Sequence, residues 1–312
     1  MDEINNNQVN YYTVTENDDN QRLDNLLIKI LKGVPKSHLY RIIRSGEVRI
    51  NKSRCSAQQK VVLNDIIRIP PIRVAAKAEQ NNFIPTAQFE ILFEDQYFLI
   101  INKPNGIACH GGSGISFGVI EQLRKSTNHK FLELAHRLDK ETSGILVLAK
   151  KRQALVDFQE LSKNNKIIKE YSAMTSGVWR DDKRNVKAPI TKYTLPNGER
   201  RVKIDFKEGQ FAHTIFTIIK KCDNFTLVNA SLQTGRTHQI RIHCQHLGYP
   251  IIGDDKYGDT ETNKQCSSLG FKRMFLHARH INFTHPITNE LVDITCQLPI
   301  ELTNFINKVS TT

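Results

Sequence analysis

The chain has 312 residues, which predicts about two domains rather than one. Its composition, 39% hydrophobic and 24% charged, is that of a globular protein and excludes a disordered or fibrous chain. The formal net charge of +12 indicates a polyanionic partner.

The positive charge is concentrated in one short segment. Residues 1–20 carry a net charge of −5, residues 21–77 carry +10, and the rest of the chain carries +7. Such a concentration is typical of a small nucleic-acid-binding module. A membrane surface explains it less well, because no Trp- or Phe-rich amphipathic helix accompanies the charge.

The cysteines and the N-terminus indicate the cellular compartment. Six cysteines are scattered without a C-x-x-C pair, which argues against a zinc site and against a disulfide framework. The N-terminus lacks the basic start and apolar run of a signal peptide, and no segment has the length of a membrane span. We therefore expect a cytoplasmic protein with no membrane partner.

The first elements predict a small basic domain over residues 21–77. Residues 1–20 read as a polar tail with one edge strand at Tyr11–Thr15. Leucines and isoleucines at helical spacing predict two helices, over Arg22–Lys32 and over about Ser37–Arg44. Two strands are predicted, at Val48–Asn51 and Asp65–Ile69, before Pro70 and Pro71 end the module.

A polar segment with one proline, residues 78–88, reads as a linker to a second domain over 89–312. Strands are predicted there at Phe89–Phe93, Phe98–Asn102, Ile145–Ala149, Ile167–Ser176, Phe211–Lys220, Thr226–Leu232 and Leu291–Thr295. Helices are predicted around Ser116–Lys125, Gln153–Ser162 and His238–Leu247. Many strands with few helices predict an α+β domain on a mainly antiparallel or mixed sheet.

Three segments carry residues suited to chemistry. The first, His110–Gly114, follows a strand and precedes a helix as a phosphate-binding loop would, but its glycines fit neither the P-loop nor G-x-G-x-x-G. A flexible turn near a ligand explains it better than a nucleotide-cofactor site.

The second segment, His136–Gly144, precedes a buried strand and places Arg137 and Asp139 on one side of an extended segment. It is either a functional loop or a polar loop in which Asp139 pairs with a neighbouring base.

The third segment, Thr234–His243, is a turn that leads into a helix rich in hydrogen-bond donors. Arg241 lies three residues after His238, on the same face of the helix. The histidines at 238, 243 and 246 raise the possibility of a metal, but no acidic partner accompanies them. Contact of cationic residues with RNA is the favoured explanation.

These segments resemble the motifs of one family. His136–Gly144 resembles the H-R-L-D-x-x-T-S-G motif of the RluA family of pseudouridine synthases. Lys169-Glu170-Tyr171 resembles its K-x-Y motif, and Thr234–His243, followed by Gly253–Gly258, resembles its third. Residues 21–70 resemble an S4 RNA-binding domain. Further segments, Leu31–Ser37, Arg68–Val74 and His110–Glu121, resemble members of this family that modify more than one uridine of 23S rRNA.

The resemblance implies an activity and roles for residues. It implies isomerisation of uridines in bacterial 23S ribosomal RNA, with Asp139 as the catalytic carboxylate and Arg241 as the arginine that pairs with it, which we expect through two parallel hydrogen bonds. It places Tyr171 in the pocket, although a tyrosine packed on a strand would otherwise be the simpler interpretation. The reaction needs no cofactor and no metal, and the sequence leaves open whether Asp139 attacks C1′, adds to the uracil ring or abstracts a ribose proton.

The expected partner is 23S rRNA, and we expect a monomer. The residues expected to contact RNA are Arg137 and His238 in the second domain and Lys36, Arg41, Arg44, Arg49 and Lys52 in the first. One rival hypothesis is a non-catalytic RNA-binding or ribosome-assembly protein. Another is a synthase of the same family that acts on tRNA or on other rRNA sites.

Overall fold

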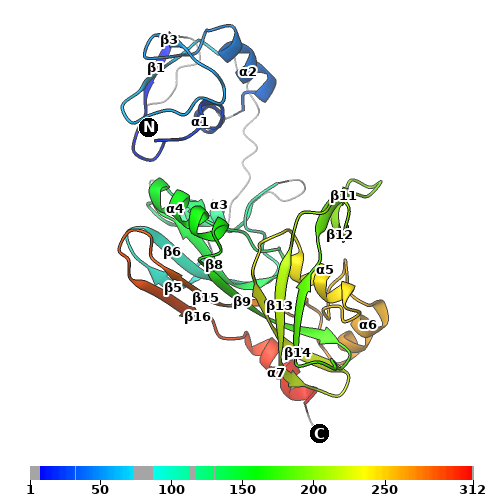
Figure 1. The fold of residues 1–312 in the computed structure, drawn as a ribbon. Coiled ribbons are helices and arrows are strands. Elements are labelled where there is room, and N and C mark those ends of the chain that lie inside the picture. Colours follow the sequence, from blue (N-terminus) through cyan, green and yellow to red (C-terminus); the bar gives the residue numbers. More distant parts are fainter. Residues whose placement is uncertain (1–7, 32, 73–86, 113–116, 130, 311–312) are drawn as a thin grey trace. The chain divides into compact units, whose positions relative to one another are not determined.

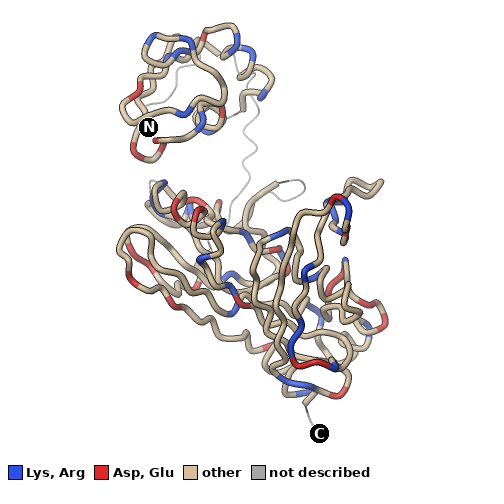
Figure 2. The backbone as a smooth tube through the Cα atoms, in the orientation of Figure 1, with Lys and Arg blue, Asp and Glu red and all other residues tan. Residues whose placement is uncertain are grey.

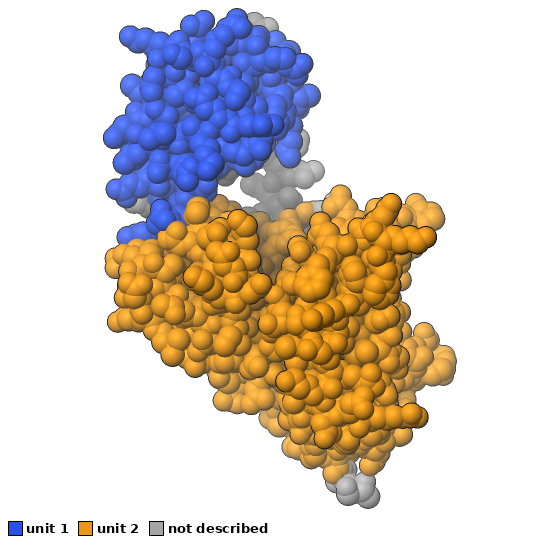
Figure 3. Space-filling model, in the orientation of Figure 1, with its two compact units in different colours: residues 1–83, 151–153 blue, residues 84–150, 154–312 orange. Residues whose placement is uncertain are grey.

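The computed structural model describes residues 8–31, 33–72, 87–112, 117–129 and 131–310. The chain forms two compact units, residues 1–83 with 151–153 (unit 1) and residues 84–150 with 154–312 (unit 2), which Figure 3 colours separately. Most of the predicted linker, 78–88, lies outside the described residues.

The described residues of unit 1 form a four-stranded antiparallel sheet with two helices, and the strands are ordered β1-β4-β2-β3 (Figure 1). Its strands are β1 (Asn10–Thr13), β2 (Arg49–Ile50), β3 (Ser53–Arg54) and β4 (Ile66–Ile69). Its helices are α1 (Leu23–Ile30) and α2 (Lys36–Arg44). The edge strand expected in the N-terminal segment is β1, and Val14 just after it is buried in the core of the unit.

Helix α2 shows why the sequence pattern folds as it does. Its apolar residues Leu39, Ile42 and Ile43 are buried in the core of the unit, as their helical spacing predicts. Arg41 and Arg44 lie exposed on the same helix. The helix therefore contributes apolar side chains to the core, while lysines and arginines recur along the chain of this unit (Figure 2).

Unit 2 is built on a ten-stranded sheet, ordered β10-β13-β14-β9-β15-β8-β6-β5, with β16 and β7 paired to β15 and β8. The strands of this sheet are β5 (Glu90–Glu94), β6 (Phe98–Lys103), β7 (Glu133–Leu134), β8 (Ser143–Ala149), β9 (Ile168–Ser176), β10 (Lys183–Lys187), β13 (His213–Lys221), β14 (Phe225–Leu232), β15 (Leu276–Thr284) and β16 (Leu291–Thr295). A separate hairpin joins β11 (Ile190–Thr194) to β12 (Arg200–Ile204).

The remaining helices are α3 (Val119–Ser126), α4 (Arg152–Lys163), α5 (Gln239–His246), α6 (Thr260–Ser268) and α7 (Ile300–Lys308). All pairings in the sheet are antiparallel except that of β15 with β8. The predicted α+β class with a mainly antiparallel sheet is therefore confirmed. In the described part of the chain, no helix is both long and apolar enough to cross a membrane.

Strand β8 fixes the position of the segment expected to carry the chemistry. All seven of its residues are buried, because it lies between β6 and β15 in the middle of the sheet. Gly144 has a φ of +106°, and a Cβ there would lie 2.2 Å from the carbonyl oxygen of Ala278 on β15. Only glycine permits this close approach, so the loop ending at β8 is held tightly against β15.

Candidate active site

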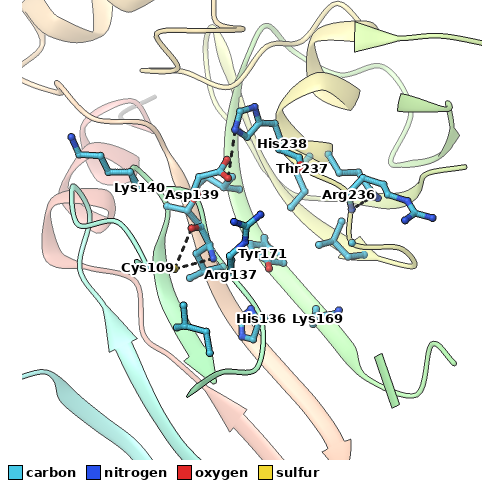
Figure 4. A pocket seen from close by; sticks show the side chains of 18 of the residues that line it. Cys109, His136, Arg137, Asp139, Lys140, Lys169, Tyr171, Arg236, Thr237 and His238 are labelled. Atoms are coloured by element: carbon cyan, nitrogen blue, oxygen red, sulfur yellow. Dashed lines mark hydrogen bonds and ion pairs between the residues drawn. The ribbon is translucent and has the colours of Figure 1, made fainter. Parts of the chain in front are cut away.

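A pocket of about 760 Å³ opens in unit 2, a volume typical of ligand-binding sites. Segments far apart in the chain line it, among them the loop before β8, β9 and the turn into α5 (Figure 4). The predicted site residues among its lining are Arg137, Asp139, Tyr171, His238 and Arg241. The fold thus brings together residues that are far apart in the sequence.

The loop that carries Asp139 is held by its own backbone and by a cysteine. The backbone N–H of Thr142 donates to the carbonyl of Asp139 at 3.1 Å and closes a turn. Leu138 points into the core, where the Cys109 thiol donates to its carbonyl and accepts from its N–H, both at 3.2 Å. Burial raises the pKa of Cys109, so the thiol keeps the proton that it donates.

A buried lysine, Lys103, also holds this loop, and sequence analysis did not predict it. The Lys103 ammonium donates to the carbonyls of Pro104 and Ile107 at 2.8 Å and of Lys140 at 3.1 Å. Its side chain is fully buried, and burial lowers its pKa to about 8. Lys140 directly follows Asp139, so Lys103 restrains the backbone next to the carboxylate. Nothing in the local sequence signals this contact, because it depends on the fold.

The carboxylate of Asp139 lies between two basic side chains. Arg241 Nη1 donates to its Oδ2 at 2.9 Å, and His238 Nε2 lies 3.7 Å from its Oδ1. Arg241 is 3% exposed, whereas Asp139 is 25% exposed and faces the pocket. The predicted pairing of Asp139 with Arg241 is therefore present. His238 was predicted only as an RNA contact, but the structure places it beside the Asp139 carboxylate.

The prediction that Arg241 holds Asp139 through two parallel hydrogen bonds is wrong. Arg241 directs its fork to Asp254 instead, with Nε donating to Oδ2 and Nη2 to Oδ1, both at 2.7 Å. Asp139 receives only the remaining Nη1 bond. A guanidinium has five donors in one plane, so it can hold one carboxylate in its fork and orient a second from its other side. Asp254 therefore fixes the arginine that orients Asp139.

Asp254 is itself fully buried and well satisfied. Burial favours its protonated form, but the hydrogen bonds and charge of Arg241 outweigh burial and lower the pKa of Asp254. The backbone N–H groups of Lys256 and Tyr257 donate to the same carboxylate at 2.9 and 3.1 Å. A buried ion pair needs such additional bonds to offset the loss of water around both charges. Sequence analysis placed Asp254 in a motif but gave it no role.

Tyr171 forms part of the pocket wall from β9. It is 8% exposed, and burial and the nearby Asp139 raise its pKa above the ordinary range. Lys169, two residues earlier on the same face of the strand, also lines the pocket, and burial lowers its pKa. The phenol is therefore protonated at neutral pH, and its ring is available for packing against a ligand.

His238 connects Asp139 to the wall of the site. Its backbone is left-handed, with a φ of 51°, where it precedes helix α5. Its Nδ1 lies 2.8 Å from the hydroxyl of Tyr257, which leaves Nε2 facing Asp139. Burial lowers the pKa of His238, so the ring is neutral at physiological pH and acts as a dipole rather than a charge.

The metal hypothesis finds no support in the third segment. His243 is buried and bonds to the hydroxyl of Thr214 and the carbonyl of Ala188, both at 2.9 Å. Within the described residues, no three His, Cys, Asp or Glu side chains are grouped so that they could hold a metal ion. Of the loop 110–114, His110 and Gly112 border the pocket, where His110 Nε2 lies 3.1 Å from Arg137.

The remaining residues expected to contact RNA lie in unit 1. Lys36, Arg41, Arg44, Arg49 and Lys52 are all exposed there. Arg41 lies 3.7 Å from Glu47, and Arg49 donates to two backbone carbonyls. The structure therefore separates the predicted residues into a pocket group in unit 2 and a surface group in unit 1.

The sheet and the pocket define a class of protein. An aspartate oriented by a buried arginine, with a buried tyrosine in the same pocket of a mainly antiparallel sheet, is the arrangement that the resemblance to the pseudouridine synthases implies. The small basic unit is an S4 domain.

Comparison with known proteins agrees with this class. The RNA pseudouridylate synthase family model matches residues 97–246, and the S4 domain model matches residues 21–67. Ribosomal large subunit pseudouridine synthase C of Pasteurella multocida (strain Pm70) is 47% identical over 303 residues, which cover 95% of this chain and 93% of that protein. The protein of that name from Escherichia coli (strain K12) is 43% identical over 309 residues, covering 96% and 97%.

A solved structure agrees as well. Human RNA pseudouridylate synthase domain containing 4 superposes with a TM-score of 0.58 at 27% identity, covering 70% of this chain and 92% of that one. This chain belongs to the RNA pseudouridylate synthase family.

Proposed function

We propose that this protein converts uridines of 23S ribosomal RNA to pseudouridine, with Asp139 as the catalytic carboxylate. The observation that carries the proposal is the Asp139 carboxylate itself. It faces a pocket, it is partly exposed, and a buried arginine orients it at 2.9 Å. The relatives named as ribosomal large subunit pseudouridine synthases support the choice of RNA.

The reaction explains why a carboxylate is sufficient. The bond from ribose C1′ to uracil N1 breaks, the base turns, and C5 bonds to C1′ while one proton passes from C5 to N1. No electrons are gained or lost and no water is consumed, so a nucleophile or base at one position can complete the cycle. Asp139 can attack C1′, add to the uracil ring, or remove a ribose proton.

Arg241 and Asp254 make Asp139 ready for this chemistry. A planar guanidinium holds a carboxylate in one orientation, which a mobile ammonium does not. With Asp254 in its fork, Arg241 presents Nη1 to Asp139 in one orientation. We propose that Tyr171 stacks on the uracil and receives the C5 proton. Because its raised pKa keeps the phenol protonated, Tyr171 first gives its own proton to N1 of the detached uracil and then takes the proton from C5, so that one proton passes from C5 to N1 overall.

The RNA must deform to use this site. A uridine reaches Asp139 only by leaving its stack, which costs a few kcal/mol. We propose that Arg137, exposed at the rim of the pocket, fills the space left by the flipped base, and that His238 contributes to RNA binding beside it.

We propose that the S4 domain, over 21–77, binds the RNA backbone through Lys36, Arg41, Arg44, Arg49 and Lys52, and that residues 89–312 form the catalytic domain. The linker would then be 78–88, after a polar tail over 1–20. Within this proposal, the protein is a cytoplasmic monomer that needs no cofactor.

Mapping pseudouridines in ribosomal RNA tests the proposal directly. RNA from cells that lack this gene should lose pseudouridine at defined 23S positions, and the purified protein should restore it in a 23S transcript. Loss confined to tRNA would favour the rival synthase. An unchanged map with altered subunit assembly would favour the non-catalytic hypothesis.

A further inference from the structure

Exposed aromatic side chains of unit 2 gather in one stretch of the chain. Among the described residues of this unit, the exposed large aromatics are Tyr193, Phe206 and Phe211, at 37%, 70% and 55% exposure. All three lie on the β11–β12 hairpin or in the turn that leads from it to β13. Exposed apolar rings that gather in this way indicate a contact surface.

The turn that presents the two phenylalanines is firmly built. The backbone N–H of Asp205 donates to the carbonyl of Pro189 at 2.9 Å, and Gln210 pairs with Ile190. The carboxylate of Asp205 accepts the N–H groups of Lys207 and Glu208, which lowers its pKa. The rings are thus displayed on an ordered backbone and lose little freedom on binding a ligand.

This turn is continuous with the candidate active site. Arg236, which lines the pocket and is labelled in Figure 4, donates from Nε to the carbonyl of Phe211 at 3.1 Å. Gln239 ties the two segments together, because it accepts from the Arg236 N–H at 3.0 Å and donates to the carbonyl of His213 at 3.0 Å. A ligand that leaves the pocket past Arg236 therefore meets Phe211 first.

Histidine rings and cations accompany the phenylalanines. The Phe211 ring lies 6.2 Å from that of His213, and the Phe206 ring lies 6.2 Å from that of His246. Several exposed cations on β10, on the hairpin and in the turn after it form no salt bridge within the described residues: Lys187, Lys192, Arg200, Lys203 and Lys207. We call these five cations, together with Phe206 and Phe211, the aromatic rim.

We propose that the aromatic rim binds single-stranded nucleotides that flank the target uridine, with their bases stacked on Phe211 and Phe206. The inference rests on the proposed function and adds the place where the RNA runs beyond the pocket. Aromatic rings among cations are how proteins bind single strands, because every base has a face to stack and every phosphate a charge. The unpaired cations favour RNA over an apolar protein partner.

Binding to a short RNA tests this inference in the full-length protein. The Asp139→Asn background prevents turnover, and the probe is a single-stranded oligoribonucleotide with 2-aminopurine next to its one uridine. We expect Phe211→Ala to weaken affinity by roughly 5- to 150-fold, the loss of one stacked base, and to remove the quenching of 2-aminopurine. Phe211→Tyr keeps the ring and should restore both. Affinity for a duplex of the same sequence should change little.

Leu291→Ala is the matched control, since Leu291 is 66% exposed on β16 but lies outside the rim. It should leave affinity and quenching unchanged. Unchanged affinity and quenching in a Phe206→Ala, Phe211→Ala double variant would overturn the inference and leave a protein as the occupant of the rim. Failure of the proposed function would appear differently, as absence of pseudouridine formation in 23S RNA by the wild-type protein.

Discussion

Unit 1 and unit 2 both depend on arginine, but they use it in different surroundings. Arg44 of unit 1 is exposed on α2, where water and ions surround it. Arg241 of unit 2 is 3% exposed and gives three hydrogen bonds to two carboxylates. An exposed arginine contributes attraction that salt screens, whereas a buried and fully bonded one fixes geometry.

This difference separates two properties of the protein. Affinity for RNA should depend on the exposed cations and respond to salt. Turnover should depend on the buried Arg241 and its two carboxylates. Substitutions there should lower turnover at any salt concentration. Substitutions in each unit can therefore break or sharpen the distinction.

The largest effect is expected at Asp139. Asp139→Asn is nearly isosteric, but the amide cannot act as nucleophile or base at neutral pH, so pseudouridine formation should be abolished. RNA affinity should stay near the wild-type value, because unit 1 is untouched. Chemical mapping of a 23S transcript measures the first property and fluorescence anisotropy the second. Residual activity of more than a few per cent in a clean preparation would disprove the assignment.

Arg241 and Asp254 should come next. Arg241→Ala removes the group that orients Asp139, and because a misplacement of about 1 Å can cost roughly 100-fold in rate, turnover should fall by about two orders of magnitude. The unfolding free energy should also fall by about 3–5 kcal/mol, because Asp254 is left buried without its partner. Arg241→Lys should lower turnover less, because charge remains but orientation is lost. Asp254→Asn should reduce turnover about tenfold with little change in KM, because it weakens the fork that aims Nη1.

A double-mutant cycle of Asp254→Asn with Arg241→Lys tests whether Asp254 affects turnover through Arg241 or independently of it. The two effects should be strongly non-additive, because Asp254 acts through Arg241. Additive effects, or wild-type turnover in Asp254→Asn, would contradict the positioning role of Asp254.

The exposed cations of unit 1 should affect binding alone. Replacing Arg44, Arg49 and Lys52 with alanine should lower RNA affinity. It should also reduce the slope of log affinity against log salt by about 0.7–0.9 for each phosphate that is no longer neutralised. Turnover at saturating RNA should be unchanged. Lys264→Ala on α6 is the control, since Lys264 is also exposed but belongs to unit 2. A slope equal to that of the wild type would show that these side chains do not touch the RNA used.

The smallest predicted effect concerns acid stability of unit 2. His277 is fully buried, and burial lowers its pKa from 6.5 to about 4. Between these values the unfolded chain binds a proton that the folded one does not. The unfolding free energy should therefore fall as pH falls through this window, by up to about 1.4 kcal/mol per pH unit for this group.

Urea unfolding followed by the fluorescence of Trp179 measures this slope, because Trp179 is the single tryptophan and is buried in unit 2. His277→Gln should flatten the slope. Substitution of the exposed His246 by Gln should leave it as it is. Equal slopes in the wild type and His277→Gln would contradict the prediction.

The sequence predicted most of the long strands of the sheet but missed β15 (Leu276–Thr284), which lies between β9 and β8 in its middle. Polar residues such as His277 and His280 interrupt the apolar pattern of this strand. Several outlying elements were missed as well. Helix α6 escaped prediction because its residues, Thr260–Ser268, are polar and bury only Cys266. It begins where Asp259 caps the N–H of Thr262. The β11–β12 hairpin was also missed, although Asn197-Gly198 at its tip is a strong turn signal that could have revealed it.

The site residues were predicted from their resemblance to family motifs rather than from local sequence patterns. Asp139 and Arg241 lie 102 positions apart, and no local pattern says that they meet. The choice of Asp254 for the fork of Arg241 was beyond prediction, because both aspartates are suitable acceptors and only the three-dimensional arrangement selects between them. Lys103 was hidden for the same reason, since its acceptors belong to loops that meet only in the fold.

Lys103 also gives the protein an alkaline limit. An ammonium has three N–H donors, and this one uses all three on backbone carbonyls. Above a pH of about 8, the neutral amine has only two, and one carbonyl of the catalytic loop or its neighbours loses its donor. Because an uncharged amine is easier to bury, this loosening brings no loss of global stability. Activity should then decline at alkaline pH while the protein stays folded. The cause is the loss of a backbone support near the catalytic loop rather than the titration of a catalytic residue.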